Sequence, residues 1–282
     1  MKKNTNSDLK KYLDDEVACA YETRIPDGFS SRHMAFVPFV FGLMYGVGIF
    51  MAHDAAMGKV AFLSNPVVVF GWVLALYCNL IGLLMFFLRW RWTAMQSGLL
   101  MIGCFPAVYY SFSGAGLADI LLYGTAPLEI KALVFGFSII WNGYWVYAII
   151  RGCGAIWNDE SLRQSVWVSY KDAVVYRRSG AKAAMDQVGI KIYPGNLTVI
   201  LSILLILPLA WWRKDVSALF GVPVVHVIGV LGQSVMVMGW TGTVLPLMLM
   251  IYYPLKIQRA TGKPVLFDMI APPTAPIPSK NR

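Results

Sequence analysis

The polar segment from Arg151 to Asn196 constrains the fold of this chain more than any other stretch. It is the one long polar segment between apolar blocks, and it separates four candidate membrane spans from two. Seven basic residues lie in it: Arg151, Arg163, Lys171, Arg177, Arg178, Lys182 and Lys191. Because loops rich in lysine and arginine stay on the cytoplasmic side of a membrane, this segment sets the predicted orientation of the whole chain.

The overall composition is that of a membrane protein. The chain is 57% hydrophobic and 14% charged, whereas a soluble domain carries roughly 25% charged residues. The net charge of +9 could indicate a nucleic-acid partner. However, the basic residues lie beside apolar runs, where the determinants of membrane topology occur. We therefore expect no nucleic acid among the partners.

The apolar runs predict an all-α fold, namely a polytopic α-helical membrane protein with about six transmembrane helices. They cover residues 35–52, 67–88, 93–112, 132–150, 197–212 and about 224–253. The fifth run has 16 residues, which make about 24 Å of helix against a hydrocarbon core of about 30 Å. This run could therefore re-enter the membrane from one side instead of crossing it.

The distribution of lysine and arginine favours six crossings. With the N-terminus and C-terminus cytoplasmic, 20 of these residues lie on the cytoplasmic side and four on the other side. If residues 197–212 re-enter instead, the counts become 17 and seven. Both arrangements obey the positive-inside rule, and six crossings obey it better. We therefore expect a multi-pass protein of the cell inner membrane.

This topology divides the chain into five regions. Residues 1–33 form a cytoplasmic segment with an amphipathic helix, and residues 34–150 form a four-helix transmembrane unit. Residues 151–196 form the basic cytoplasmic loop, and residues 197–253 add two further transmembrane helices. Residues 254–282 form a basic, proline-rich cytoplasmic tail that we expect to be disordered or extended.

An amphipathic helix is expected within the loop. Asn158 or Asp159 can cap it, and it continues to Arg178, where Ser179 and Gly180 stop it. Its apolar face carries Leu162, Val166, Tyr170 and Val174. The basic residues that fall largely outside this face are Arg163, Lys171, Arg177 and Arg178. Such a helix is typical of the membrane surface, and packing against other cytoplasmic segments is the alternative.

Familiar catalytic motifs are missing from the sequence. It contains neither a HExxH metalloprotease motif nor a Walker phosphate-binding loop. The predicted spans contain no Asp, Glu, Lys or Arg, which counts against a proton relay. We expect no cofactor, and the sequence leaves a metal undecided.

Two groups of polar residues remain as candidate sites. The first is a midplane group, in which each residue lies near the middle of a predicted helix: Asn79, Asn142 and Gln233. Amides in hydrocarbon seek hydrogen-bond partners in neighbouring helices. These residues therefore either hold helices together or line a polar pathway.

The second group lies at the outer face of the predicted topology. Its members come from the first and last spans and from the glycine-rich stretch 113–130, which we expect to be a loop: His53, Asp54, Asp119, Glu129 and His226. Imidazole and carboxylate groups could bind a transition metal or respond to pH. Polar residues that cap helix ends at the membrane interface explain the group equally well.

The favoured function is that of a non-enzymatic subunit or partner-binding component of a membrane complex. A channel or transporter that uses the midplane amides is the alternative, and a membrane-embedded lipid-modifying enzyme is the third hypothesis. The expected partners are the lipid bilayer and other membrane proteins or a second copy of the chain.

Overall fold

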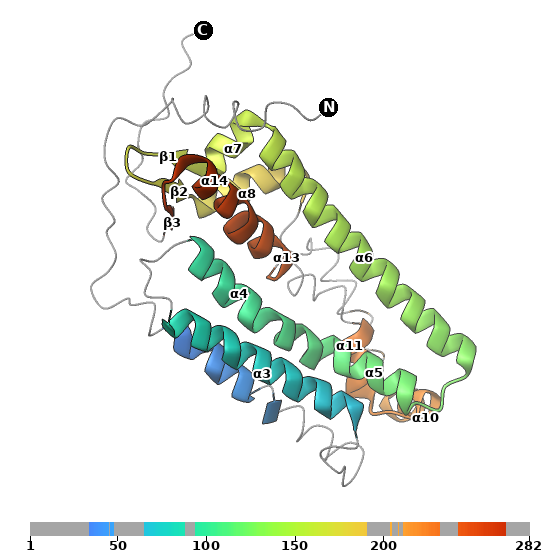
Figure 1. Ribbon diagram of the computed structural model, residues 1–282. Helices are drawn as coiled ribbons and strands as arrows, with labels where there is room; N and C mark the ends of the chain where they lie inside the picture. The colour runs from blue at the N-terminus through green and yellow to red at the C-terminus, as the bar shows by residue number, and fades with distance from the viewer. Residues whose placement is uncertain are drawn as a thin grey trace.

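A computed structural model describes residues 34–44, 46–47, 65–87, 94–190, 204, 208, 211–231 and 242–268. These residues are mostly helical, and the chain folds into a bundle of lengthwise helices with a small mixed α/β unit at one end (Figure 1). The helix expected within residues 1–33 and the proline-rich end of the tail lie outside the described residues.

The first half of the bundle is built from long apolar helices. Helix α3 is Pro66–Phe87. Helix α4, Ala94–Tyr109, continues through the π-helix η1, Tyr110–Gly114, into α5, Ala115–Leu122. Helix α6 is Leu128–Asn158. A shorter helix, Met34–Met44, packs antiparallel on α3.

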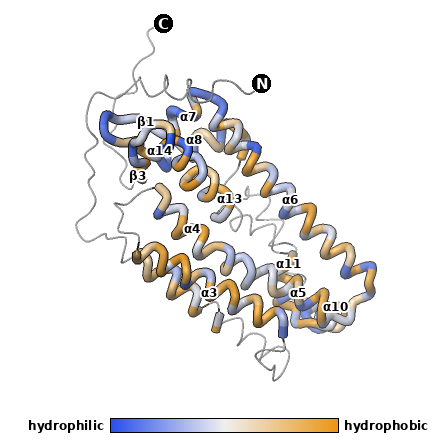
Figure 2. The backbone as a smooth tube through the Cα atoms, in the orientation of Figure 1, coloured by the Kyte–Doolittle hydropathy of each residue, from blue (hydrophilic) through white to orange (hydrophobic). Residues whose placement is uncertain are grey.

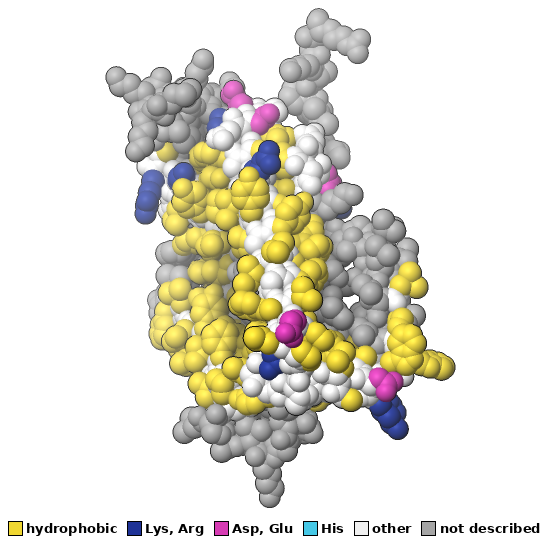
Figure 3. Space-filling model, turned by 90° about the vertical axis from the view of Figure 1, so that its right-hand side faces the viewer, with side chains coloured by type: hydrophobic (Ala, Val, Ile, Leu, Met, Phe, Trp, Pro, Cys, Tyr) yellow, Lys and Arg dark blue, Asp and Glu magenta, His cyan; other side chains and the backbone are white. Residues whose placement is uncertain are grey.

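Two of these helices, α3 and α6, are long and apolar enough to cross a membrane by length and composition. Figure 2 shows hydrophobic residues along the lengthwise helices and more hydrophilic residues in the α/β unit. Viewed from the side of α6, hydrophobic side chains form a band between charged side chains at the two ends (Figure 3). In α6 itself, the uncharged stretch 132–150 has 19 residues, which make about 28 Å of helix and match a hydrocarbon core of about 30 Å.

The α/β unit, which we name the cap, is built from two segments far apart in the sequence. The first segment follows α6 and contains α7 (Glu160–Val166), β1 (Trp167–Ser169), β2 (Val174–Tyr176) and α8 (Arg178–Gln187). The second contains α14 (Tyr253–Thr261) and β3 (Val265–Phe267). It follows α13 (Val244–Pro246) and the π-helix η3 (Leu247–Tyr252).

The cap contains a three-stranded sheet in the order β1-β2-β3. Strands β1 and β2 pair antiparallel, with Trp167 opposite Tyr176. Strands β2 and β3 pair parallel, with Val174 opposite Val265. Trp167, Tyr176 and Tyr253 are buried together in the core beneath this sheet. The two segments of the cap therefore share one hydrophobic core.

The loop helix expected to reach Arg178 is wrong, because α7 ends at Val166 and the chain continues as a β-hairpin. The two strands are rich in valine and aromatic residues, which favour strand over helix. Their apolar side chains are buried in the cap, so tertiary packing also decides the local structure. The expected N-cap residue of the helix is confirmed, since the Asp159 side chain accepts a hydrogen bond from the Leu162 backbone N–H.

Two further expectations need correction. The stretch 113–130 was expected to be a loop, yet it is helical as far as Leu122 and resumes as α6 at Leu128. Glycine occurs in this helix because a residue without a side chain lets a neighbouring helix approach closely. The tail was expected to be disordered or extended from residue 254, yet α14 and β3 occupy its first part. Gly262, at φ 71°, ends α14 and lets the chain turn into β3.

The remaining described helices lie at the end of the bundle opposite the cap, which we name the far end (Figure 1). They are α10, which is Arg213–Phe220, and α11, which is Val224–Leu231. The backbone N–H of Thr125, in the turn between α5 and α6, donates a hydrogen bond to the Phe220 carbonyl of α10. The far end is therefore formed by α10 together with the α5–α6 turn.

Candidate functional site

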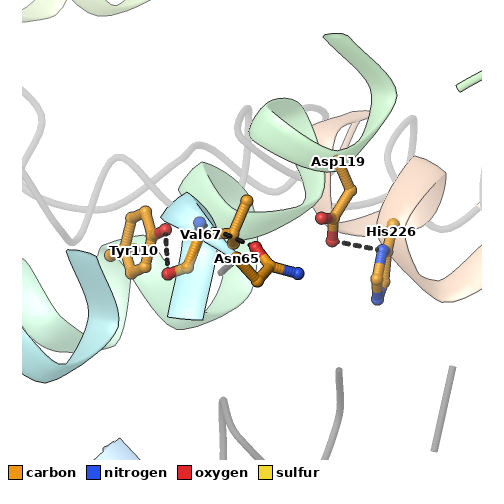
Figure 4. A network of polar contacts seen from close by, with 5 residues as sticks. All are labelled: Asn65, Val67, Tyr110, Asp119 and His226. Atoms are coloured by element: carbon orange, nitrogen blue, oxygen red, sulfur yellow. Dashed lines mark hydrogen bonds and ion pairs between the residues drawn. The ribbon is translucent and has the colours of Figure 1, made fainter. Parts of the chain in front are cut away.

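A buried acid–imidazole pair joins α5 to α11 near the far end. The Oδ2 atom of Asp119 lies 2.8 Å from the Nδ1 atom of His226 (Figure 4). The Asp119 side chain is 0% exposed and the His226 side chain is 12% exposed. Both residues belong to the outer-face group predicted from the sequence, and the structure brings these two together.

Apolar side chains surround the pair. Ile120 of α5 and Val227 and Val230 of α11 are buried in one hydrophobic cluster. The two helix backbones also touch, because a Cβ atom at Gly116 would lie 2.6 Å from the His226 carbonyl oxygen. Glycine at this position is what lets α5 and α11 approach closely enough for the pair to form.

Further polar contacts cross between helices in the same region. The Ser113 hydroxyl of η1 donates a hydrogen bond to the Gly229 carbonyl at 3.0 Å. The Tyr110 hydroxyl donates to the Val67 carbonyl at 2.8 Å, and the Val67 N–H donates to Asn65 Oδ1 at 2.9 Å (Figure 4). These bonds fix η1 between α3 and α11, and π-helical turns of this kind occur frequently at functional sites.

The position of Asp119 along the bundle follows from its neighbours. Lys131 lies near the start of α6, and its ammonium donates a hydrogen bond to the Leu121 carbonyl at 3.2 Å. Asp119 precedes Leu121 by two residues in α5. It therefore lies about half a helical turn further into the bundle than the carbonyl that Lys131 contacts. The pair is close to the far end, with the Asp119 side chain buried and the His226 side chain partly exposed.

The midplane amides do not form a single cluster among the described residues. Asn79 of α3 faces Gly42 of the helix Met34–Met44. Asn142 of α6 accepts a hydrogen bond from the Tyr109 hydroxyl of α4 at 2.7 Å and donates one to the Ser138 carbonyl. Helix α4 lies between α3 and α6 in Figure 1. The third amide, Gln233, lies outside the described residues.

The other members of the outer-face group are placed apart from the pair or are not described. Glu129 lies exposed in the first turn of α6, where a negative charge complements the helix dipole. His53 and Asp54 lie outside the described residues. In the part of the chain that the structure describes, no group of three or more His, Cys, Asp or Glu side chains is placed to hold a metal ion.

The four basic residues expected at the membrane surface fall in the cap. Lys171 and Arg178 are exposed, whereas Arg163 and Arg177 are partly buried. Arg163 donates a hydrogen bond to the Trp157 carbonyl at 3.0 Å, and its guanidinium lies over the Trp157 ring. Arg163 therefore ties α7 to the end of α6.

Several titrating groups of the cap have pKa values that differ from their ordinary ones, among them Asp159 and Tyr176. The side-chain hydrogen bond from Ser161, together with the bond from the Leu162 N–H, lowers the pKa of the Asp159 carboxyl. Burial raises the pKa of the Tyr176 hydroxyl. Asp159 therefore keeps its charge at the start of α7, and Tyr176 stays neutral in the cap core.

The sequence did not point to Tyr110, which links η1 to α3, or to the role of Ser113 in holding η1 against α11. The available signal was the length of the uncharged run from residue 93 to residue 118, which exceeds one bilayer crossing. That length could have indicated one long helix with Asp119 inside it. Comparisons of the chain with protein-family models, with curated proteins and with solved structures find no match.

Proposed function

We propose that this chain is a multi-pass inner-membrane protein that acts as a non-enzymatic, partner-binding component of a membrane complex. In this proposal the helices anchor the protein in the bilayer, and the cap lies on the cytoplasmic side and binds the partner. The observation that carries the proposal is the cap itself, a folded α/β unit built from two distant segments at one end of the bundle.

The pairing of β2 with β3 supports six crossings. It joins the 151–196 segment to the tail, so both must lie on the same side of a membrane. Ile190 belongs to the cap core, whereas α10 begins at Arg213 at the far end, and α14 returns the chain to the cap. The chain therefore travels the length of the bundle twice between the two cap segments, which favours crossing over re-entry for residues 197–212.

The charge on the surface of the cap favours a protein partner that carries acidic groups. Exposed basic side chains occur on the cap and on the adjoining end of α6: Arg151, Lys171, Arg178, Lys182, Lys256 and Arg259. Arg178 and Lys182 are one turn apart on α8, and Asp186 follows on the same face. The adjoining face of α8 carries Ala181, Ala184 and Met185, which are buried. Helix α8 therefore offers a rigid charged row to a partner.

A channel or transporter is a second candidate, and the Asp119–His226 pair favours it. Ionisable residues buried between membrane helices are rare, and they commonly mark the pathway of an ion or a substrate. The amide pathway that first suggested this function has less support, because Asn142 bonds to Tyr109 and Asn79 faces a different helix.

The test is the stoichiometry of the native complex after extraction in a mild detergent. We expect the full chain to co-purify with a partner in a fixed ratio, and the double variant R178E/K182E to lose that partner while its thermal unfolding midpoint stays unchanged. The control variant D186K, on the same face of α8, should retain the partner. A wild-type chain that purifies alone in bilayer-like conditions would contradict the proposal.

A further inference from the structure

We propose that the exposed face of α14, made of Lys256, Arg259 and the N-cap residue Tyr252, binds the phosphate of an anionic phospholipid, with Lys256 as the residue in contact. The proposal rests on the proposed function in that it requires the cap to lie on the cytoplasmic side of a membrane. Its own supports are the aromatic rings that position Lys256, the level of these rings along the bundle and the charge of the segment.

The first step is the division of α14 into two faces. Tyr253 and Ile257 are buried in the cap core. Tyr252 is exposed, and so are Lys256 and Arg259, which follow it by four and seven residues. Residues at this spacing lie on one face of a helix. One exposed tyrosine and two exposed basic residues therefore form a row that leads from the bundle along the cap.

The second step is the aromatic platform that positions the Lys256 ammonium. Its Nζ atom lies 4.5 Å from the ring centroid of Tyr252 and 5.8 Å from those of Tyr253 and Trp157. Such cation–π contacts hold an ammonium in place but provide no acceptor for its three N–H donors. Among the described residues, the structure shows no hydrogen bond or ion pair of this ammonium. The Lys256 donors are therefore available to an anion.

The third step is the level of the platform along the bundle. Arg151 follows the uncharged stretch 132–150 of α6, and Trp157 lies six residues further on, about 9 Å along the helix. The headgroup region of a bilayer adds about 5–8 Å on each side of the hydrocarbon core. Because side chains of a helix point toward its N-terminus, Lys256 reaches from the level of Trp157 back over Tyr252, toward the apolar band. The ammonium therefore lies at the level of the lipid phosphates.

The fourth step is the charge of the segment. Residues 253–267 contain Lys256, Arg259 and Lys263 and neither Asp nor Glu. Lys263 is bonded within the cap, whereas Lys256 is exposed and is the first charged residue after the last predicted span. The cytoplasmic leaflet carries anionic lipids, which attract basic residues that flank a membrane helix. Charge complementarity therefore favours an anionic lipid as the occupant of this face.

The experiment is a lipid titration of the purified full chain in a mild detergent, followed by native mass spectrometry. Phosphatidylglycerol is the anionic probe and phosphatidylcholine the zwitterionic one, and we expect tighter binding of the anionic lipid. K256M should lose about fivefold in affinity for phosphatidylglycerol, which corresponds to about 1 kcal/mol per basic residue near an anionic surface. K256R keeps the charge and should bind like the wild type. Equal affinities of K256M and the wild type for phosphatidylglycerol would overturn the proposal.

Further variants separate a built site from general attraction to positive charge. Y252L removes a ring beneath Lys256 and keeps every charge, so it should weaken phosphatidylglycerol binding about two- to fivefold, the effect of one cation–π contact at an exposed site. The matched controls are Y147L, on the exposed side of α6, and K171M, in the exposed hairpin turn. Both should bind like the wild type. A loss in K171M equal to that in K256M, with none in Y252L, would overturn the site.

This titration is independent of the partner-binding test, because it uses the chain without a partner. The variant R178E/K182E should lose the partner and keep its binding of phosphatidylglycerol. K256M should keep the partner in the native complex. Loss of the partner in K256M would instead assign Lys256 to the partner interface and overturn the lipid site.

Discussion

The indole ring of Trp157 stacks on the ring of Tyr253, with centroids 4.4 Å apart and an interplanar angle of 10°. Trp157 lies in the last turn of α6 and Tyr253 begins α14, so this contact joins the long helix that precedes the cap to the helix of the cap's second segment. Trp167 of β1 packs edge-on against both rings. The three rings form the joint between the bundle and the cap.

Truncation of Trp157 to alanine should therefore destabilise the protein strongly. Trp157 is buried in the cap core, and removing a buried tryptophan costs about 3–5 kcal/mol. Denaturant unfolding of the purified protein measures this loss. The control is W211A, because Trp211 is 86% exposed and its loss should change stability by no more than about 0.5 kcal/mol. Equal effects of the two variants would show that the stack contributes nothing.

The pairing of β3 with β2 gives a prediction about truncation. Removing residues 263–282 deletes β3 and the hydrogen bond from the Lys263 ammonium to the Tyr170 carbonyl. We expect rapid proteolysis within residues 170–173, because the hairpin loses its neighbouring strand. Removing residues 269–282 alone keeps β3 and should leave the hairpin protected. Protection of the hairpin in the shorter chain would argue against the parallel pairing.

Acid should weaken the start of α7 through its N-cap. The folded-state pKa of Asp159 is lowered by its bonds from Ser161 and Leu162, so its stabilising contribution is present above the unfolded-state pKa. It is lost as the pH falls through the lowered folded-state pKa. Thermal unfolding midpoints measured between pH 3 and pH 6 should show this acid loss in the wild type. In D159N the neutral amide still caps the helix, so the acid loss attributable to this position should vanish.

The hydrogen bond from Tyr109 to Asn142 predicts energetic coupling between α4 and α6. N142L should cost about 0.6–2 kcal/mol, and its effect should be less than additive with that of Y109F. N79L should be additive with N142L, because Asn79 faces the helix Met34–Met44. A double-mutant cycle of unfolding free energies measures both combinations, and coupling between the two asparagines would contradict their separate placement.

The sequence predicts the apolar helices of the first half of the bundle, α3, α4 and α6, because a long uncharged apolar run is a local property. The cap was not predictable in the same way. Val166, Tyr170 and Val174 share the apolar face of the predicted helix, yet Val174 belongs to β2 and pairs with Val265 of β3, which lies far along the chain. Such long-range pairing leaves no signal in a local window.

The candidate site was predictable in its residues but not in its depth. Asp119 and His226 were expected to belong to one polar group at the outer face, and the structure brings them into contact. The burial of Asp119 depends on the continuation of α4 through η1 into α5. Gly114 and Gly116 in this stretch led to the prediction of a loop. The local glycine pattern therefore predicts exposure, whereas helix packing determines burial.

The most direct test of the account is the side of the membrane on which the two ends of the bundle lie. Single cysteines are introduced at Ser179 in α8, at Lys214 in α10 and at Ala275 in the tail, in a variant that lacks Cys19, Cys78, Cys104 and Cys153. Impermeant thiol reagents applied to intact cells should label position 214 and leave positions 179 and 275 unlabelled until the membrane is permeabilised. Labelling at position 275 without labelling at position 179 would contradict the six-crossing arrangement and the shared cytoplasmic cap.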